Sequence, residues 1–470
     1  MKFRFFRFVF FLSLVGFLGS CVSSTTQAIS SDASFSSLTL AGNDSVNKAV
    51  FTLDGTTILN LDSLPYQSKI DSVYPTFSFK STAASFLHVQ LNGNYKFLKG
   101  RTVDSIYITS GKDTIDMRQP NLWIRNFASD SKTNLRYSIK LNVHQVDPNL
   151  YKWSKVKNNV GSVLPSSQKA IILNDIFYYY MNDGSQSYLY KSTDGNIWNA
   201  ATVTGLPVGT SLIDIIQFNG KLYLTRDGAN LYTSADGATW NKSQPSSAFK
   251  FKSLAFVLNN QLWAVVQPNP TDGTYHFATS NDGITWNMTT GTLPVYFPVI
   301  DFASVTFKTV TGKEKVLIIG GFAANGVQTV SRWSSEDGVY WVDFSRENYT
   351  LPEFLGAPSL IRYDNKLLVL GEGQDLQSSM ITVYKQSVDE GYSWQTPDTL
   401  RNILPANFKP RKNTSFIVFK PKDYPKLSPA SLSDEIKSTN YIFIIGGNTE
   451  TGSLTDVWTG KVNKKNFLRQ

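Results

Sequence analysis

The chain has 470 residues, of which 41% are hydrophobic, 13% aromatic and 17% charged, and its formal net charge is +9. This composition is typical of a globular, strand-rich protein and excludes a disordered or collagen-like chain. The length predicts at least two domains. The basic residues are scattered, so we expect no nucleic-acid groove.

The N-terminus has the pattern of an export signal. Residues 1–20 combine a basic start, an apolar run over 8–18 and two small residues directly before Cys21, the one cysteine of the chain. This arrangement resembles a bacterial lipoprotein signal, which implies a lipid on Cys21 and a place at the outer membrane, facing the periplasm or the cell surface. The alternative is an ordinary signal peptide with a chance cysteine.

Residues 21–44 are rich in Ser and Thr and predict a flexible tether. Residues 45–148 then predict a β-sandwich of the immunoglobulin type, because short strand-like runs alternate with Gly, Pro, Asn and Asp. Its histidines, His88 and His144, have no neighbouring cluster of ligands, so we expect no metal site.

A short motif recurs through the rest of the chain. Five copies of Ser-x-Asp-(x)-Gly-x-x-Trp lie 42 to 55 residues apart, and their aspartates are Asp194, Asp236, Asp282, Asp337 and Asp389. Asp and Ser side chains accept backbone N–H bonds in tight turns, Gly adopts positive φ, and Trp buries a large area. We therefore expect these aspartates to be structural, and the spacing indicates propeller blades.

Each copy follows a predicted hairpin, and hairpin plus motif makes four strands, or one blade. Five hairpins turn at 174–175, 219–220, 259–260, 311–313 and 364–365, and a sixth pairs 415–419 with 441–445 across a long polar insertion. The last unit lacks the motif, whereas the strand at 151–156 has no hairpin before it. Residues 149–470 therefore predict a six-bladed β-propeller closed by residues 151–156, in an all-β protein.

The motif resembles the Asp-box of sialidases and related propellers. The segments 318–321 and 444–447, each Ile-Ile-Gly-Gly, resemble kelch repeats. The whole layout resembles an uncharacterised family of lipoproteins from gut-dwelling Gram-negative anaerobes, with an N-terminal sandwich and a C-terminal propeller. This resemblance implies the fold but no assigned activity.

Two functions are compatible with these patterns. One is a non-catalytic binding or scaffold module, anchored to the membrane by its lipid, for a glycan or an envelope protein. The alternative is a sialidase or kelch-type enzyme acting on sialic acid or related glycans, but the Arg-Ile-Pro that the sialidase resemblance requires is missing. No catalytic residue or cofactor motif stands out, so we favour binding over catalysis.

The loops that join second to third strands, and one blade to the next, are expected on one face of the propeller. They are longer and more varied than the motif turns, and variable loops on a rigid scaffold commonly carry binding sites. Within them we select five candidate ligand-binding residues that combine aromatic and hydrogen-bonding groups: Arg226, His276, Tyr296, Phe297 and Glu372.

The lipoprotein interpretation predicts the outcome of a single substitution. Cys21→Ala removes the thiol that would carry the lipid, so the protein should leave the membrane fraction and accumulate as an unprocessed precursor. Fractionation followed by immunoblotting measures both effects. Unchanged processing and membrane association would contradict the interpretation.

Overall fold

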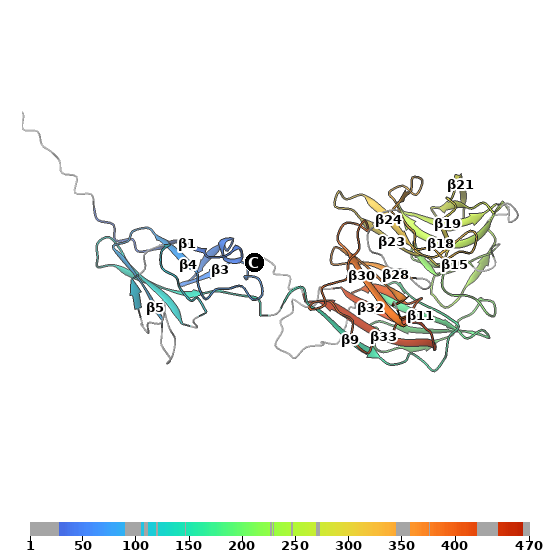
Figure 1. Ribbon diagram of the computed structural model, residues 1–470, viewed down its shortest axis with the longest axis horizontal. Coiled ribbons are helices and arrows are strands. Elements are labelled where there is room, and N and C mark those ends of the chain that lie inside the picture. The colour runs from blue at the N-terminus through green and yellow to red at the C-terminus, as the bar shows by residue number, and fades with distance from the viewer. Residues whose placement is uncertain are drawn as a thin grey trace, which may run out of the picture. The chain divides into compact units, whose positions relative to one another are not determined.

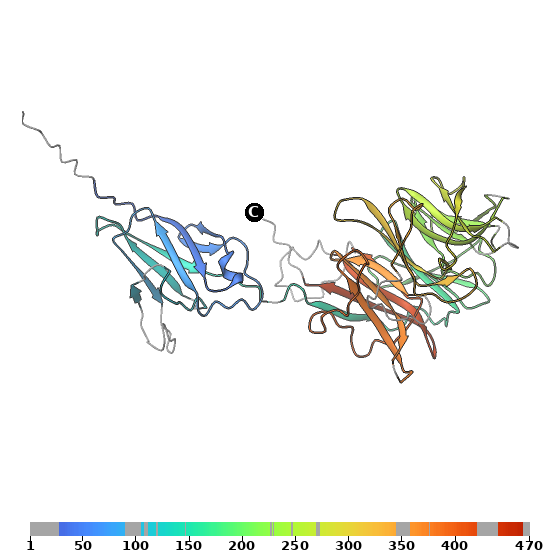
Figure 2. The same ribbon diagram turned by 45° about the horizontal axis from the view of Figure 1, so that its top comes forward.

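The computed structural model divides the chain into two compact units, residues 1–145 and 146–470. Apart from one short helix, the regular elements of its described part are β-strands (Figures 1 and 2). The predicted signal peptide, Cys21 and Arg226 lie outside the described residues. The structure describes residues 28–89, 105–107, 111–118, 121–145, 147–225, 228, 230–245, 248–268, 273–344, 358–375, 377–420 and 440–463.

The first unit contains two sheets. The smaller sheet pairs β1 (Phe35–Ala41) with β4 (Tyr74–Phe79), and α1 (Asp44–Asn47) follows β1. The larger sheet has, in spatial order, β2 (Phe51–Asp54), β3 (Thr57–Asn60), β8 (Asn134–Lys140), β7 (Leu122–Phe127), β5 (Ala84–Val89) and β6 (Ser105–Tyr107). Its pairs are antiparallel except for β3 and β8, which are parallel.

The core of this unit corrects the predicted tether. Leu38 and Leu40 of β1 are buried against Val46, Ile58 and other apolar side chains of both sheets. The tether was expected to reach residue 44, but the ordered sheet already begins at residue 35. The Ser and Thr residues of this segment alternate with apolar ones, which is the pattern of a strand with one buried face.

The second unit is built from successive antiparallel sheets. The first sheet has the strands β10 (Ser167–Leu173), β11 (Ile176–Asn182), β12 (Ser187–Ser192) and β13 (Asn199–Ala201). The second has β14 (Ile216–Phe218), β15 (Lys221–Thr225), β16 (Leu231–Ser234) and β17 (Asn241–Ser243). The third has β18 (Lys250–Leu258), β19 (Gln261–Gln267), β20 (His276–Ser280) and β21 (Asn287–Thr292).

Three further sheets and one short ribbon follow in the described part of this unit. The ribbon pairs β22 (Pro298–Ile300) with β25 (Phe322–Ala323). The sheets have the strands β23 (Ala303–Lys308), β24 (Glu314–Ile319), β26 (Arg332–Ser335) and β27 (Val342–Asp343); β28 (Ser359–Tyr363), β29 (Lys366–Gln374) and β30 (Met380–Ser387); and β31 (Ser415–Phe419), β32 (Tyr441–Thr449), β33 (Gly452–Val462) and β9 (Tyr151–Lys157).

These sheets form a closed ring. The first strand of each sheet neighbours the first strand of the next, in the cycle β10, β14, β18, β23, β28, β31 and back to β10. The last sheet takes its fourth strand from the start of the unit, since β9 pairs with β33 from Val457↔Lys157 to Val462↔Tyr151. Figure 1 shows β9 beside β33, so the two ends of the unit meet in one sheet.

The fifth sheet departs from the expected four strands. After Trp394 the chain makes only an isolated bridge, Gln386↔Gln395, and then turns away. Trp394 itself is buried in the core that the fourth and fifth sheets share. The motif therefore places its tryptophan here without extending the sheet to a regular fourth strand.

The recurring motif folds into a tight turn, as its composition predicts. In the third copy, Asp282 accepts bonds from the backbone N–H groups of Ile284 and Thr285, both at 2.7 Å. Ser280 donates to Asp282 at 3.0 Å and accepts from Gly283 N–H at 2.8 Å. The backbone donors favour the ionised carboxylate and lower the pKa of Asp282 to about 2.

The motif glycine has a second role, which is contact with the preceding sheet. A Cβ on Gly338, whose φ is 76°, would lie 2.3 Å from the Trp263 ring on β19. The other four motif glycines meet a second-strand side chain of the preceding sheet in the same way: Gly195 with Phe443, Gly237 with Tyr178, Gly283 with Tyr223 and Gly391 with Leu317. The first of these pairs joins the first sheet to the last.

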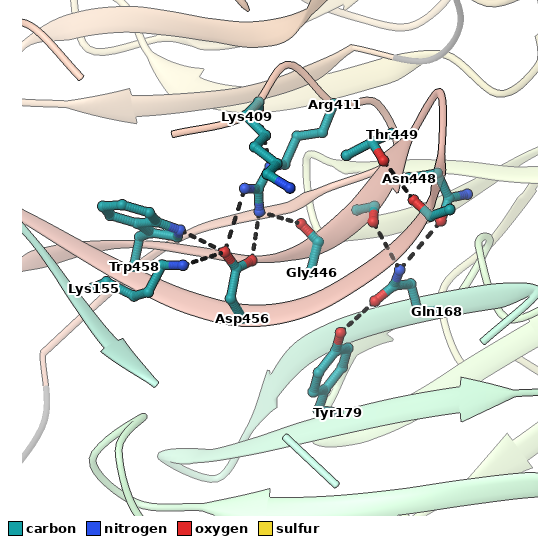
Figure 3. A network of polar contacts seen from close by, with 12 residues as sticks. Lys155, Gln168, Tyr179, Lys409, Arg411, Gly446, Asn448, Thr449, Asp456 and Trp458 are labelled. Atoms are coloured by element: carbon teal, nitrogen blue, oxygen red, sulfur yellow. Dashed lines mark hydrogen bonds and ion pairs between the residues drawn. The ribbon is translucent and has the colours of Figure 1, made fainter. Parts of the chain in front are cut away.

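A polar network also ties the last sheet to its neighbours (Figure 3). Buried Arg411 donates to buried Asp456 at 2.5 Å, and Lys155 of β9 lies 3.4 Å from the same carboxylate. Gln168 of β10 donates to Gly447 O at 3.2 Å and accepts from Tyr179. These contacts thus link β9 to β33 within the last sheet and join that sheet to the first one.

The glycine contact predicts a difference between two alanine substitutions. Both Gly338→Ala and Gly220→Ala place a Cβ at a positive φ, which costs about 1–2 kcal/mol. Only Gly338→Ala also forces that Cβ into the aromatic ring of Trp263, since nothing lies within 4 Å of the Cβ position at Gly220. Overpacking should add about 1–3 kcal/mol at Gly338. Urea unfolding measures both losses, and equal losses would contradict the role of the contact.

Candidate functional site

In four sheets of the second unit, a charged side chain lies near the beginning of the first strand, at one end of the ring. Lys169 lies in β10 and Lys252 in β18, while Asp214 and Asp301 stand two residues before β14 and β23. Because these strands are successive neighbours around the axis, the four side chains gather at one end of it. We name Lys169, Asp214, Lys252 and Asp301 the axial cluster.

The axial cluster is electrostatically coupled and keeps contact with solvent. Lys252 is exposed and the other three members are half-buried. In the described part of the chain, none of the four makes an ion pair within 4 Å or a side-chain hydrogen bond. The cluster therefore offers two cations and two acids that are not neutralised by direct contacts.

Burial controls the protonation of the two acids. Burial, with a smaller contribution from Asp301, raises the pKa of Asp214 to about 7 against the opposing effect of Lys169 and Lys252. Burial also raises the pKa of Asp301, against the attraction of Lys252, and lowers the pKa of Lys169. Asp301 is held in the left-handed region at φ 55°, a conformation that Asp adopts more readily than most residues.

A second charged pair lies at the same end of the ring. Ser359, the first residue of β28, pairs with Leu370, so Glu372 lies just beyond the start of that axial strand. Glu372 is buried, its Oε1 lies 3.0 Å from Lys412 Nζ, and its Oε2 has no hydrogen-bond partner among the described residues. This predicted site residue therefore stands near the axial strands, but its carboxylate is largely covered.

The other described candidates make no hydrogen bond or ion pair with Glu372. His276 begins the third strand of its sheet, and its Nδ1 lies 3.2 Å from Thr289 O. Tyr296 is 72% exposed, as a ligand-binding residue could be. Phe297 is fully buried and packs against Phe277 and other aromatic rings, so its selection as a binding residue was wrong.

Sequence reasoning missed the axial cluster, although a weak signal exists. Lys169 directly precedes the apolar run 170–173 of β10, and Lys252 follows Phe251 near the start of β18. A charge in such a strand indicates solvent on that face, but the strands of different repeats can be joined into one site only when the ring is known. No described group of three or more His, Cys, Asp or Glu side chains is placed to hold a metal ion.

Two hollows of the described part are lined by other residues than the axial cluster. One, of about 380 Å³, lies along β12 and β13 and the loop that follows them. The other, of about 700 Å³, belongs to the first unit. Among the described helices, none is long and apolar enough to cross a bilayer.

The raised pKa of Asp214 predicts a pH-dependent effect of Asp214→Asn. The folded state holds this proton more tightly than the unfolded chain, so the stability that protonation contributes is complete near pH 4 and is lost as the pH rises through about 7. Asparagine cannot ionise and avoids this loss. The free energy of unfolding of the variant should therefore rise relative to that of the wild type as pH increases, by about 1–2 kcal/mol at pH 8 once solvent screening is allowed for.

Thermal melts between pH 4 and pH 8 measure this gain. Asp175→Asn is the matched control, because Asp175 is exposed in the turn of the first hairpin and lies outside the axial cluster. The gain with pH should be larger for Asp214→Asn than for Asp175→Asn. A pH-independent difference for Asp214→Asn would contradict the burial of this carboxyl.

Structural comparisons find solved structures that resemble this chain only at low similarity. A structure of YjhT is 14% identical with a TM-score of 0.43, covering 64% of this chain and 96% of its own. A DUF4623 family protein from Bacteroides eggerthii is 11% identical with a TM-score of 0.40, covering 91% and 98%. AofleA from Arthrobotrys oligospora is 14% identical with a TM-score of 0.37, covering 66% and 86%.

Family models match both units of the chain, whereas no curated protein matches it in sequence. The DUF6242 N-terminal domain, a domain of unknown function, matches residues 23–141. The DUF6242 beta propeller domain matches residues 147–470, which is more than half of the chain and the whole of the closed ring of sheets. The chain therefore belongs to the DUF6242 family, with a β-propeller as its C-terminal domain.

Proposed function

We propose that this protein is a lipid-anchored cell-envelope lipoprotein whose propeller binds a glycan at the axial cluster without catalysing a reaction. The finer architecture belongs to the same proposal: an immunoglobulin-like sandwich, then six blades with Asp-box turns and β9 closing the ring. The proposed lipid anchor rests on the sequence pattern before Cys21. That pattern is compatible with either side of the outer membrane.

The axial cluster is the observation that carries the binding proposal. Half-buried charges without direct partners lower stability, because they lose hydration without gaining an ion pair. Such groups concentrate at functional sites. With Lys169 and Lys252 as donors and Asp214 and Asp301 as acceptors, the cluster suits a ligand that both donates and accepts hydrogen bonds, as sugar hydroxyls do.

Charge balance favours a sugar over the other ligand classes. A purely anionic ligand would meet Asp214 and Asp301, and a purely cationic one would meet the two lysines. Polyhydroxylated ligands avoid both conflicts. An envelope protein is the other partner that the sequence suggests, and it would have to present polar groups of both kinds to this end of the ring.

The arginines give little support to the sialidase alternative. Arg411 is paired with Asp456, Arg401 with Asp147 and Asp398, and Arg332 donates to backbone carbonyls at Phe344 and Tyr392. Among the described residues, none of these three arginines belongs to the axial cluster. A grip on a carboxylate by several arginines would need a different arrangement.

A glycan array probed with the full chain in detergent tests the proposal. The wild type should bind a defined set of glycans, and Lys252→Met should weaken that binding about tenfold by removing one donor. Lys221→Met is the matched control, since Lys221 is exposed at the hairpin turn of the second sheet, away from the start of the axial strands. Its binding should match the wild type.

Binding that survives Lys252→Met and Asp214→Asn unchanged would contradict a site at the axial cluster. Release of product from a fluorogenic sialoside by the same preparation would contradict the non-catalytic role. Protection in hydrogen exchange by a bound glycan should fall on the segments that begin the axial strands. Protection confined to the motif turns would exclude this end of the ring.

A further inference from the structure

The larger sheet of the first unit presents a polar and aromatic outer face. Along β7, Leu122 and Ile124 are buried, whereas Trp123 and Arg125 between and beyond them are half-buried. Along β8, Tyr137 and Ile139 are buried and their neighbours are exposed. The side chains opposite the core therefore share one solvent-facing surface, and this surface is rich in cations: Arg125, Arg136 and Lys140.

Trp123 fixes one of these cations in place. Its ring stacks on His88 of the neighbouring strand, with centroids 3.7 Å apart and planes 5° apart. The Arg136 guanidinium carbon lies 3.8 Å from the centroid of the Trp123 ring. A guanidinium stacked on an indole keeps its N–H edges available for in-plane hydrogen bonds, and less side-chain entropy is lost when a ligand binds.

Neither Arg136 nor Lys140 is neutralised within the described part of the chain, where no carboxylate lies within 4 Å of either. Arg118 is different, because it lies 2.6 Å from Asp116 and 3.6 Å from Asp71. The two uncompensated cations therefore form a positive site beside an aromatic edge.

A pocket of about 700 Å³ opens beside these cations. Its lining includes Trp123, Arg136, Lys140, Ser138, Thr57 and Gln145. The volume is within the range of small-ligand sites. Arg118, which is paired with Asp116, also lines the pocket, as do Ser68 and Asn121. The hydroxyls and amides add neutral donors and acceptors to the two uncompensated cations, so the wall can bond both to an anionic group and to several hydroxyls of one ligand.

We propose that this pocket binds an acidic glycan through a carboxylate-bearing sugar. The planar Arg136 fork matches the two oxygens of a carboxylate, and Lys140 adds a second charge at the same wall. Ser138, Thr57 and Gln145 bond the sugar hydroxyls, and the edge of Trp123 covers the apolar face of the ring. This site lies in the first unit and is independent of the function proposed for the propeller.

Calorimetry of the full chain with trigalacturonate, and with maltotriose as the neutral counterpart, tests the site. The wild type should bind the acid and not the neutral sugar. Arg136→Gln should weaken binding at least tenfold, Arg136→Lys about threefold to tenfold because charge remains without the fork, and Lys140→Gln several-fold. Lys132→Gln is the matched control. Lys132 is an exposed cation in the turn that precedes β8, whereas Lys140 lies at the other end of that strand.

Three results would overturn the proposal. One is absence of trigalacturonate binding by the wild type, or equal binding of both sugars. Another is equal weakening by Lys132→Gln and Arg136→Gln, which would indicate only the long-range charge of the unit. The third is full displacement of trigalacturonate by an equal concentration of inorganic phosphate, which would indicate a simple anion site. Melting curves establish whether each variant is folded. If Arg136→Gln does not fold, Arg136→Lys, which retains the charge, replaces it in the comparison.

Discussion

The contact between a motif glycine and the preceding sheet is the interaction on which the ring depends. Each motif turn can approach a neighbouring second strand only because its glycine lacks a Cβ, and Phe443, Tyr178, Tyr223, Trp263 and Leu317 occupy that space. The same residue also supplies the positive φ that the turn requires. One glycine therefore couples local turn geometry to the spacing between sheets, and the repeat of this coupling carries the chain around the axis.

Closure of the ring uses other interactions, because the last sheet has no copy of the motif. The strand β9, at the start of the unit, forms backbone hydrogen bonds with β33. Buried Asp456 accepts hydrogen bonds from Arg411 and the Trp458 indole and forms an ion pair with Lys155. A buried carboxylate of this kind is stable only while its partners remain. The final sheet is thus tied to the start of the unit by strand pairing, and to the first sheet by the bond from Gln168 to Gly447 O and by apolar packing.

The two proposed binding sites differ in what surrounds their charges. The axial cluster balances two lysines against two acids inside the ring, where burial raises the pKa of Asp214 and lowers that of Lys169. The pocket of the first unit carries cations on an exposed sheet face, and Trp123 holds Arg136 in a defined orientation. A neutral polyhydroxylated ligand suits the first arrangement and an acidic one the second. The protein would then contact two chemically distinct parts of a glycan-rich surface.

The sequence by itself determined the strands, the turns and their repetition, because these depend on neighbours in the chain. The Ser-x-Asp-Gly pattern contains the donors and acceptors of its own turn. Turn residues such as Asn and Gly between apolar runs indicate the hairpins. Tertiary structure alone decided which residues meet at the axis, since Lys169 and Asp301 are far apart in the chain and share no motif. It also placed Phe297 in the core and Trp123 between His88 and Arg136. Burial and contact between distant segments depend on how the sheets pack, and no local pattern encodes that.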